Sequence, residues 1–228
     1  MAVYRGPDIV TSGLVLCLDA ANSKSYPGSG TIWSDLSGNG YNGILTNGPT
    51  YNSSNGGIIV FDGTNDYCDI GNRSALSMGT GDFTFDFWVK ISSIVSFGSI
   101  ISASDTATVP HPNGSYQLSM NSNGTIAFLQ GAGTICTSSS SIVLNSWINI
   151  CLSRLSGTIT MYFNTTSVAS VSHTSDLNNY IYLMLGRNRA NSIFLNLSLG
   201  SARIYKNKGL NTSEILQNYN ATKGRFGL

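Results

Sequence analysis

The chain has 228 residues, of which charged side chains make up 10%, and its formal net charge at pH 7 is +1. Globular domains usually contain about 25% charged residues, so this composition provides neither a basic surface for nucleic acid nor a cationic surface for an anionic membrane. A chain of this length buries enough surface to fold without disulfides or a metal. We therefore expect no required cofactor, no nucleic-acid partner and no membrane partner.

Residues 1–12 predict an arm that leads into the first strand. They contain no basic segment followed by an apolar core, so we expect no signal peptide. Apolar runs along the chain stay shorter than the roughly 20 residues of a membrane-spanning helix. The sequence predicts one domain over residues 13–222 and a short tail over 223–228.

Short β-branched and aromatic runs, bounded by Gly, Asn, Asp and Ser, recur along the whole domain and predict an all-β sandwich. In one of them Phe83, Phe85 and Phe87 alternate with Thr84 and Asp86, which predicts a strand with one face in the core. The runs cover residues 13–20, 56–63, 66–71, 83–91, 98–104, 115–120, 124–131, 147–154, 157–164, 181–187 and 199–205.

An oxygen-rich loop, "WSDLSGNG", follows the first strand. Asp35, Ser37 and Asn39 have the spacing of the first ligands of an EF-hand, but Thr46 stands where that motif needs a bidentate Glu. An EF-hand is excluded. Two interpretations remain: the loop binds one calcium ion with ligands from elsewhere, or Asp35 forms an Asx-type turn with backbone amides. The turn is favoured.

Six aromatic residues, one of them Tyr26, could stack on a sugar ring. Trp88 and Trp147 lie within strand patterns and are expected in the core. Trp33, Tyr41 and Tyr51 lie in or beside loops, and we expect them to form an exposed carbohydrate-binding platform.

The four cysteines, Cys17, Cys68, Cys136 and Cys151, form no C-x-x-C pair. Buried free thiols are the favoured interpretation, because two of the cysteines lie in apolar runs. A bridge between Cys136 and Cys151 is the alternative, since a hairpin could bring their strands together.

One segment, "NTSEILQNYNATKG", predicts a helix. Asn211 can cap its first turn, and Glu214 has the spacing of a capping box. Gly224 is the predicted end of the helix.

The acidic residues argue against glycoside hydrolysis, which needs two carboxylates about 5–10 Å apart. Glu214 is the single glutamate and has the capping role, and most of the aspartates lie in turns. The pairs available are Asp66 with Asp69 and Asp82 with Asp86. We expect no enzymatic activity.

The histidines offer no nucleophilic site either. His111 lies in a proline-rich turn and His173 in a Ser/Thr-rich stretch, without a motif-level Ser or Cys partner. Both are expected in exposed loops.

Taken together, the chain resembles the laminin-G-like, concanavalin A-type jelly rolls. The resemblance implies two packed antiparallel sheets of six or seven strands each and one short C-terminal helix. Many relatives bind calcium with the Asp of this loop and an acidic residue before a late strand. Asp35 matches the loop Asp of these relatives. At the position of their acidic residue, this chain has Leu199, Gly200 and Ser201 instead. The stretches that carry the resemblance are "WSDLSGNGYNGIL", "IIVFDGTNDYCDIG", "GDFTFDFWVK", "NSWINICLSR", "GTITMYFN" and "LGSARIYKNKGLNTSEILQNYNATKGRF".

Two stretches, "LVLCLDAANSKSYPGSGTIWSDLSGNG" at the start and "EILQNYNATKGRF" at the end, also resemble structural proteins of tailed, cyanophage-like bacteriophages. This implies a non-enzymatic virion protein, such as a capsid decoration or a tail fibre or knob, on the surface of the phage particle. Its partners would be other virion proteins, further copies of itself and a host-surface glycan. The alternative is a carbohydrate-binding module for receptor recognition, and a polysaccharide hydrolase or lyase is the least favoured.

Overall fold

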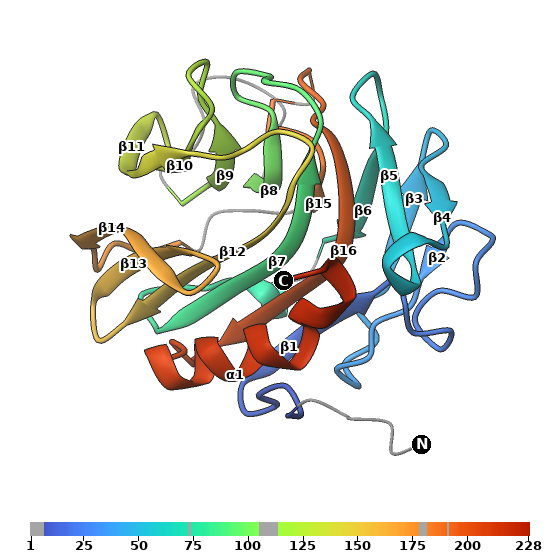
Figure 1. Cartoon of the computed structure of the whole chain (residues 1–228). Coiled ribbons are helices and arrows are strands. Elements are labelled where there is room, and N and C mark those ends of the chain that lie inside the picture. The colour runs from blue at the N-terminus through green and yellow to red at the C-terminus, as the bar shows by residue number, and fades with distance from the viewer. Residues whose placement is uncertain (1–6, 73, 105–113, 178–181, 191) are drawn as a thin grey trace.

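The computed structural model is an all-β sandwich of two antiparallel sheets with one α-helix near the C-terminus (Figure 1). The predicted fold class is therefore confirmed. The structure describes residues 7–72, 74–104, 114–177, 182–190 and 192–228.

Sheet A has eight strands within the described residues. In spatial order they are β14 (Thr166–Ser172), β13 (Thr158–Phe163), β12 (Trp147–Leu155), β7 (Phe83–Ile91), β16 (Asn196–Lys206), β5 (Ile58–Asp62) and β4 (Thr50–Asn52), with β1 (Leu14–Asp19) also paired to β16.

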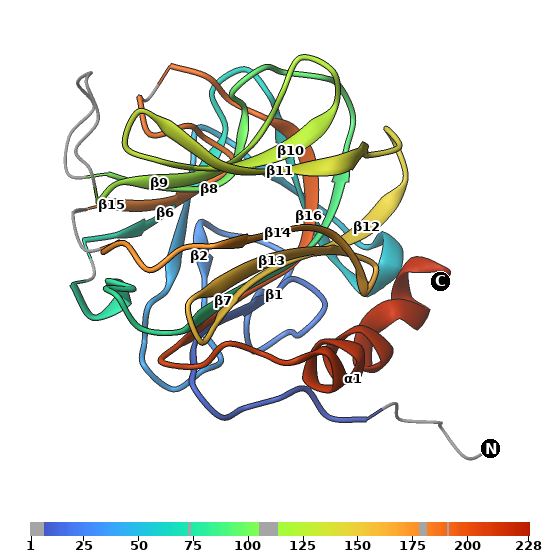
Figure 2. The same cartoon turned by 90° about the vertical axis from the view of Figure 1, so that its left-hand side faces the viewer.

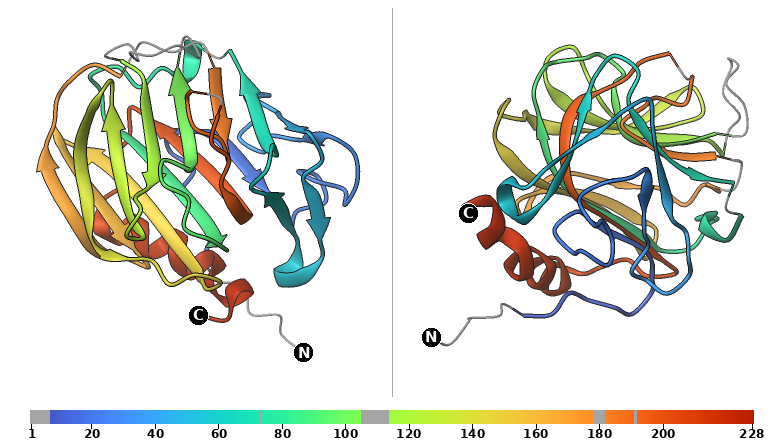
Figure 3. Two further views of the ribbon diagram at one scale, coloured as in Figure 1. Left: turned by 90° about the horizontal axis from the view of Figure 1, so that it is seen from above. Right: turned by 90° about the vertical axis from the view of Figure 1, so that its right-hand side faces the viewer.

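Sheet B also has eight described strands, one or two more than the resemblance implied. The additional strands are short: β2 has two residues and, in sheet A, β4 has three, so neither makes a recognisable alternating pattern. Figure 3 shows β2–β4 at one end of the sandwich and the hairpins β10–β11 and β13–β14 at the other. The order of sheet B is β11 (Gly133–Ser141), β10 (Thr125–Gln130), β9 (Tyr116–Met120), β8 (Ser99–Ser104), β15 (Tyr182–Leu185), β6 (Tyr67–Gly71), β3 (Gly43–Thr46) and β2 (Ile32–Trp33).

The core between the sheets is aromatic along β7, as the alternation predicted. Phe83, Phe85 and Phe87 are fully buried in it. Phe85 stacks on Tyr116 of sheet B, with ring centroids 5.4 Å apart. Trp88, on the opposite face of β7, is also buried, because the C-terminal helix covers the outside of sheet A.

Helix α1 (Thr212–Thr222) lies against the outer face of sheet A (Figure 2). The predicted capping box is confirmed: Asn211 Oδ1 accepts from the Ser213 and Glu214 N–H groups, and Glu214 Oε2 accepts from the Asn211 N–H. Short 3₁₀ helices occur at Ser54–Gly56 (η1), Ser74–Leu76 (η2) and Lys223–Phe226 (η3). In the described part of the chain, none of the helices is both long and apolar enough to span a membrane.

Residues 223–228, which we expected as a tail, continue from α1 as η3. Phe226 is buried against Trp88, with ring centroids 4.3 Å apart. The prediction that Gly224 ends the helix is wrong: Gly224 lies inside η3, and Gly227 takes the left-handed conformation (φ +76°) after it.

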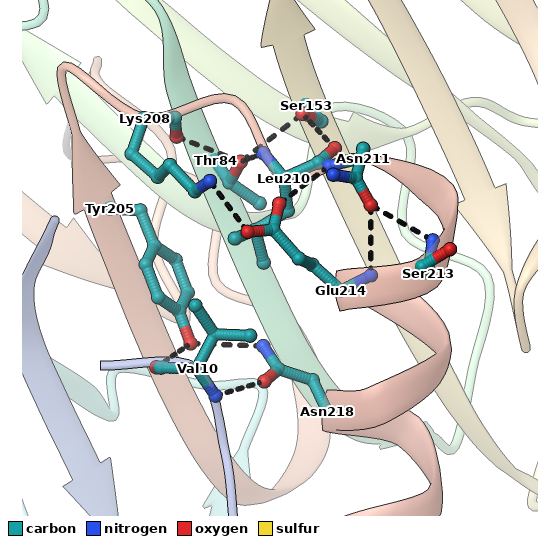
Figure 4. A network of polar contacts seen from close by, with 10 residues as sticks. All are labelled: Val10, Thr84, Ser153, Tyr205, Lys208, Leu210, Asn211, Ser213, Glu214 and Asn218. Atoms are coloured by element: carbon teal, nitrogen blue, oxygen red, sulfur yellow. Dashed lines mark hydrogen bonds and ion pairs between the residues drawn. The ribbon is translucent and has the colours of Figure 1, made fainter. Parts of the chain in front are cut away.

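The described part of the N-terminal arm is fixed to α1. The Val10 N–H donates to Asn218 Oδ1 at 2.8 Å, and the Val10 carbonyl accepts from the Tyr205 hydroxyl at 3.0 Å (Figure 4). Asn218 Nδ2 donates to the Tyr205 oxygen at 2.9 Å. Arm, helix and β16 therefore share one network.

An ion pair lies beneath this network. Arg203 Nη1 is 3.1 Å from Asp86 Oδ2, and both side chains are 2% exposed. Asn149 Nδ2 donates to Asp86 Oδ1 at 2.7 Å, and Asn218 Nδ2 donates to Oδ2 at 3.1 Å. The carboxylate thus connects β7, β12, β16 and α1.

All four cysteines are buried and free, so the favoured interpretation is confirmed and the Cys136–Cys151 bridge is wrong. The two thiols lie in different layers. Cys136 is on β11 and belongs to the core between the sheets, whereas Cys151 is on β12 and packs with Val10 and Ile215 outside sheet A. Burial raises the pKa of Cys17 and of Cys136 to about 11.

Candidate functional site

The loop of Asp35, Ser37 and Asn39, for which the sequence favours a turn over a calcium site, is a hydrogen-bonded turn. Asp35 Oδ1 accepts from the Cys17 and Ser37 N–H groups, both at 2.9 Å. Asp35 Oδ2 accepts from the Ser37 hydroxyl at 2.7 Å and from the Tyr41 N–H at 3.1 Å. The Asx-type turn is confirmed. Each of the two Asp35 carboxylate oxygens, which a cation would need as ligands, already accepts two hydrogen bonds.

The structure brings Asp35, Ser37 and Asn39 together against β1, where Asn39 Nδ2 donates to the Val15 carbonyl at 3.2 Å. Within the described ranges, no three His, Cys, Asp or Glu side chains gather in a way that could hold a metal ion. The loop is therefore explained by its own hydrogen bonds, and calcium binding remains a matter for experiment.

The predicted aromatic platform is not formed as expected. Trp33 is fully buried in the core, so the prediction that it is exposed is wrong. Pairing of β2 with β3 turns Trp33 inward and leaves its neighbour Ile32 53% exposed. Tyr41 and Tyr51 are half-buried and pack against the core. Their role in carbohydrate binding stays a prediction.

A different pocket, of about 330 Å³, lies on the face of sheet B that is turned away from sheet A. Three separate segments line it. Phe97 comes from the connection between β7 and β8, Gln117 and Leu129 from β9 and β10, and Asn188 and Arg189 from the segment between β15 and β16.

The strand alternation explains which residues reach this pocket. Tyr116 and Leu118 of β9 point into the core, so Gln117 between them points outward. Gln117 pairs with Leu129 of β10 across the sheet, which places an amide beside an apolar side chain. The floor of the pocket is thus built on two rigid strands.

The segment after β15 crosses the outer face of sheet B and forms one wall. The Ser102 hydroxyl of β8 donates to the Arg187 carbonyl at 2.7 Å. Asn188 Oδ1 accepts from the Ser192 and Ile193 N–H groups, both at 3.1 Å, and so closes a tight turn. These bonds hold the wall against the sheet.

Two arginines of this segment are buried. Arg189 is 5% exposed; its Nη1 donates to the Ser115 carbonyl (3.2 Å) and hydroxyl (3.1 Å), and its Nη2 donates to the Gly131 carbonyl. Its Nε has no partner. Burial lowers the pKa of Arg189 to about 10. The Arg187 guanidinium lies 3.8 Å from the centre of the Tyr67 ring.

Phe97 stands at the mouth of the pocket and is 50% exposed. Its φ is +64°, the left-handed region that bulky side chains rarely adopt, and its N–H donates to the Met120 carbonyl at 2.8 Å. Strained conformations of this kind persist where the surrounding structure enforces them, often at binding sites. An open aromatic face, an amide and a guanidinium therefore meet around one cavity, which is the composition of a small-molecule site.

The carboxylates considered for hydrolysis have structural partners elsewhere. Asp86 pairs with Arg203, and Asp82 Oδ1 accepts from the Ser156 N–H at 2.9 Å. Asp69 Oδ1 accepts from the Gly71 N–H at 2.6 Å, and Asp66 Oδ2 accepts from the Asp62 N–H at 3.1 Å. No described residue that lines the pocket is acidic.

The histidines differ from expectation where they are described. His173 follows β14 and is half-buried rather than exposed, and its Nδ1 has no hydrogen-bond partner. His111 lies outside the described residues.

Sequence reasoning missed Phe97, Gln117 and Arg189. Two signals were available. Phe97 is an aromatic residue in the Ser- and Gly-containing stretch "SIVSFGS", outside any alternating pattern, and "GRNRANS" places two arginines close together in a chain with few charges. These stretches are far apart in the sequence and come together only through strand pairing, such as that of β9 with β10.

The family comparison agrees with this architecture. The model of the Concanavalin A-like lectin/glucanases superfamily matches residues 62–216, more than half of the chain. The chain belongs to this family. The comparison with curated proteins finds no match.

Solved structures with this fold include proteins that contact sugars. A Trypanosoma rangeli sialidase in complex with 2,3-difluorosialic acid is 17% identical (TM-score 0.71), and the match covers 96% of this chain and 35% of the sialidase. Domain 4 of an extracellular arabinanase from Geobacillus stearothermophilus, in complex with arabinotriose, is 18% identical (TM-score 0.71; 91% and 98% covered). The binding domain of Paraclostridial Mosquitocidal Protein 1 is 19% identical (TM-score 0.68; 92% and 52% covered). The chain spans about a third of the sialidase, and these identities show a shared fold alone.

Proposed function

We propose that this chain is a non-enzymatic carbohydrate-binding module whose site is the pocket of Phe97, Gln117 and Arg189. The observation that carries the proposal is the half-exposed ring of Phe97, held with positive φ beside an amide and a guanidinium. An aromatic face can cover the apolar C–H face of a sugar, while amide and guanidinium groups pair with its oxygens. The family and the arabinotriose complex of a similar fold support this assignment.

Binding without hydrolysis follows from where the carboxylates lie. Hydrolysis of a glycosidic bond needs an acid and a nucleophile or base about 5–10 Å apart on either side of the bond. The described lining of the pocket offers amides, a guanidinium and apolar groups instead. Glu214, the single glutamate, caps α1 on the far side of sheet A.

A virion location is the second part of the proposal. The sequence stretches that resemble structural proteins of tailed phages support a capsid decoration or a tail fibre or knob. Ile32 and Ile44 also support assembly: they pair across β2 and β3 at the end of sheet B and are 53% and 46% exposed. Exposed apolar side chains on an edge strand favour contact with another chain. Further copies of this chain or other virion proteins would cover them.

Glycan-array binding of three purified proteins tests the site. We expect the wild type to bind a defined set of glycans, Phe97→Ala to lose at least tenfold in affinity, and Tyr51→Ala to bind like the wild type. Tyr51 is the matched control because it is an aromatic residue of the site predicted from sequence. Binding that survives Phe97→Ala but not Tyr51→Ala would move the site to that loop region, and no binding by folded wild type would overturn the function.

Sedimentation and virion fractionation test the location. An assembled module has a mass that is a multiple of 24.2 kDa and co-purifies with phage particles at a fixed stoichiometry. A monomer that is absent from purified particles would contradict the virion role and leave the carbohydrate site to be judged by the array.

A further inference from the structure

Arg189 differs from the other buried arginines in its charge environment. Arg203 is paired with Asp86, and the pKa of Arg154, lowered by burial, is partly restored by the nearby Asp82 and Asp176 carboxylates. For Arg189, burial lowers the pKa, and no carboxylate of the described residues opposes this shift. An unpaired buried cation is costly, so its presence beside a cavity needs an explanation.

The hydrogen bonds of Arg189 leave donors unused. A guanidinium has five N–H donors, and the contacts to Ser115 and Gly131 use at most three of them. The Nε–H has no acceptor, and the one bond of Nη2, to Gly131, leaves its second N–H available for another. A carboxylate can accept two such N–H groups at once, in the bidentate geometry that makes arginine–carboxylate pairs strong. Because Nε itself is covered, full pairing needs a small rotation of the side chain when a ligand binds.

The rest of the pocket is neutral. Phe97 and Leu129 supply apolar surface, and Gln117 and Asn188 supply amide groups. Its volume of about 330 Å³ is at the lower end of the roughly 300–1,000 Å³ typical of ligand pockets, which suits one sugar residue better than a long segment. Arg189 is the one cationic residue of the described lining. The pocket therefore suits a ligand that carries a single negative charge.

We propose that the ligand is an acidic saccharide, a sugar residue carrying a carboxylate, and that Arg189 binds this carboxylate while Phe97 covers the sugar ring. The inference rests on the proposed carbohydrate-binding function and narrows it to one chemical class.

Calorimetric titration with matched saccharide pairs tests the proposal. The probes are sialyllactose against lactose, a glucuronic acid disaccharide against its glucose counterpart, and sulfated lactose as a second anion. We expect the wild type to prefer at least one carboxylated probe over its neutral counterpart by tenfold or more, with an affinity that falls as salt is added.

Variants of Arg189 assign the preference to this side chain. Arg189→Met is expected to bring the ratio of affinities for the carboxylated and the neutral probe to about one, and Arg189→Lys is expected to restore part of the preference for the carboxylate. Thermal unfolding of each variant shows whether it is folded, because Arg189→Met removes a buried charge but also the donor of the hydrogen bonds to Ser115 and Gly131.

The outcomes separate the two proposals. Equal binding of neutral and acidic probes, or a carboxylate preference that survives in Arg189→Met, overturns the acidic-ligand inference and leaves carbohydrate binding intact. A preference for sulfated lactose over sialyllactose and over the glucuronic acid disaccharide also overturns it. No binding of any saccharide by folded wild type overturns both.

Discussion

Removal of the Asp86 carboxylate is expected to cost the protein a large part of its stability. Asp86→Ala takes away the acceptor of three hydrogen bonds, from Arg203 and Asn218 at 3.1 Å and from Asn149 at 2.7 Å. Burial alone would lower the pKa of Arg203, but Asp86, with smaller contributions from Cys17, Tyr205 and Asp19, outweighs this effect and raises it. Without Asp86 the guanidinium stays charged, 2% exposed and unpaired.

The magnitude follows from measured cases of broken buried ion pairs. Loss of one partner costs about 3–5 kcal/mol, whereas a whole domain is stable by roughly 5–15 kcal/mol. For a chain of this size, each kcal/mol lowers the melting temperature by about 2–4 °C, so Asp86→Ala should melt about 6–20 °C below the wild type. Urea unfolding at equilibrium gives the free energy directly.

A double variant tests the physical cause. Asp86→Leu with Arg203→Met replaces the pair by apolar side chains and removes both charges, so we expect it to be more stable than Asp86→Ala by at least about 1 kcal/mol. An Asp86→Ala protein within about 1 kcal/mol of the wild type would refute the reasoning. So would a double variant that is less stable than both of its component single variants, Asp86→Leu and Arg203→Met, because the two losses would then be independent.

Three further predictions concern groups away from the pocket. Asp35→Ala should lower the unfolding free energy by about 1–3 kcal/mol, because it leaves the Cys17 and Tyr41 N–H groups without an acceptor. We expect added calcium to leave the melting temperature of the wild type unchanged. A higher melting temperature with calcium would support the metal interpretation of the loop. Burial lowers the pKa of His173, so the folded state binds fewer protons than the unfolded state as pH falls below about 6.5. Stability should therefore fall from about pH 7 to about pH 5 by more in the wild type than in His173→Asn, and equal slopes would contradict this. Burial raises the pKa of Cys17 and Cys136. A thiol reagent at about pH 8 should therefore label the folded chain slowly and should label all four cysteines after denaturation. Rapid labelling of the native protein would show that a thiol is accessible.

Structural features that depend on short sequence patterns could be predicted from the sequence. The alternation around Phe85 predicts a core strand, the spacing of Asn211 and Glu214 predicts a capping box, and Asp35 predicts an Asx-type turn; the structure confirms all three. In each case the pattern that carries the prediction lies within a few residues along the chain, although Asp35 also accepts from the Cys17 N–H, 18 residues away. Such features depend on backbone geometry and on nearby donors and acceptors.

Features that depend on strand pairing could not be read in this way. Trp33 is buried because β2 pairs with β3. Strand β2 is only two residues long, so it has no alternating sequence pattern that would predict this pairing. The pocket joins Phe97, Gln117 and Arg189, which come together when β9 and β10 pair and the segment after β15 folds over them. No short-range pattern contains that information.

Binding at the pocket can be observed residue by residue in an NMR titration with a saccharide that the array identifies, since a chain of 24.2 kDa gives resolved backbone amide spectra when deuterated. We expect the amide shifts to change at Phe97, at Gln117 and around Asn188 and Arg189, and we expect these changes to disappear in Phe97→Ala. Shifts that change instead around the Asp35 turn and Tyr51, or nowhere at saturating sugar, would contradict binding at this pocket.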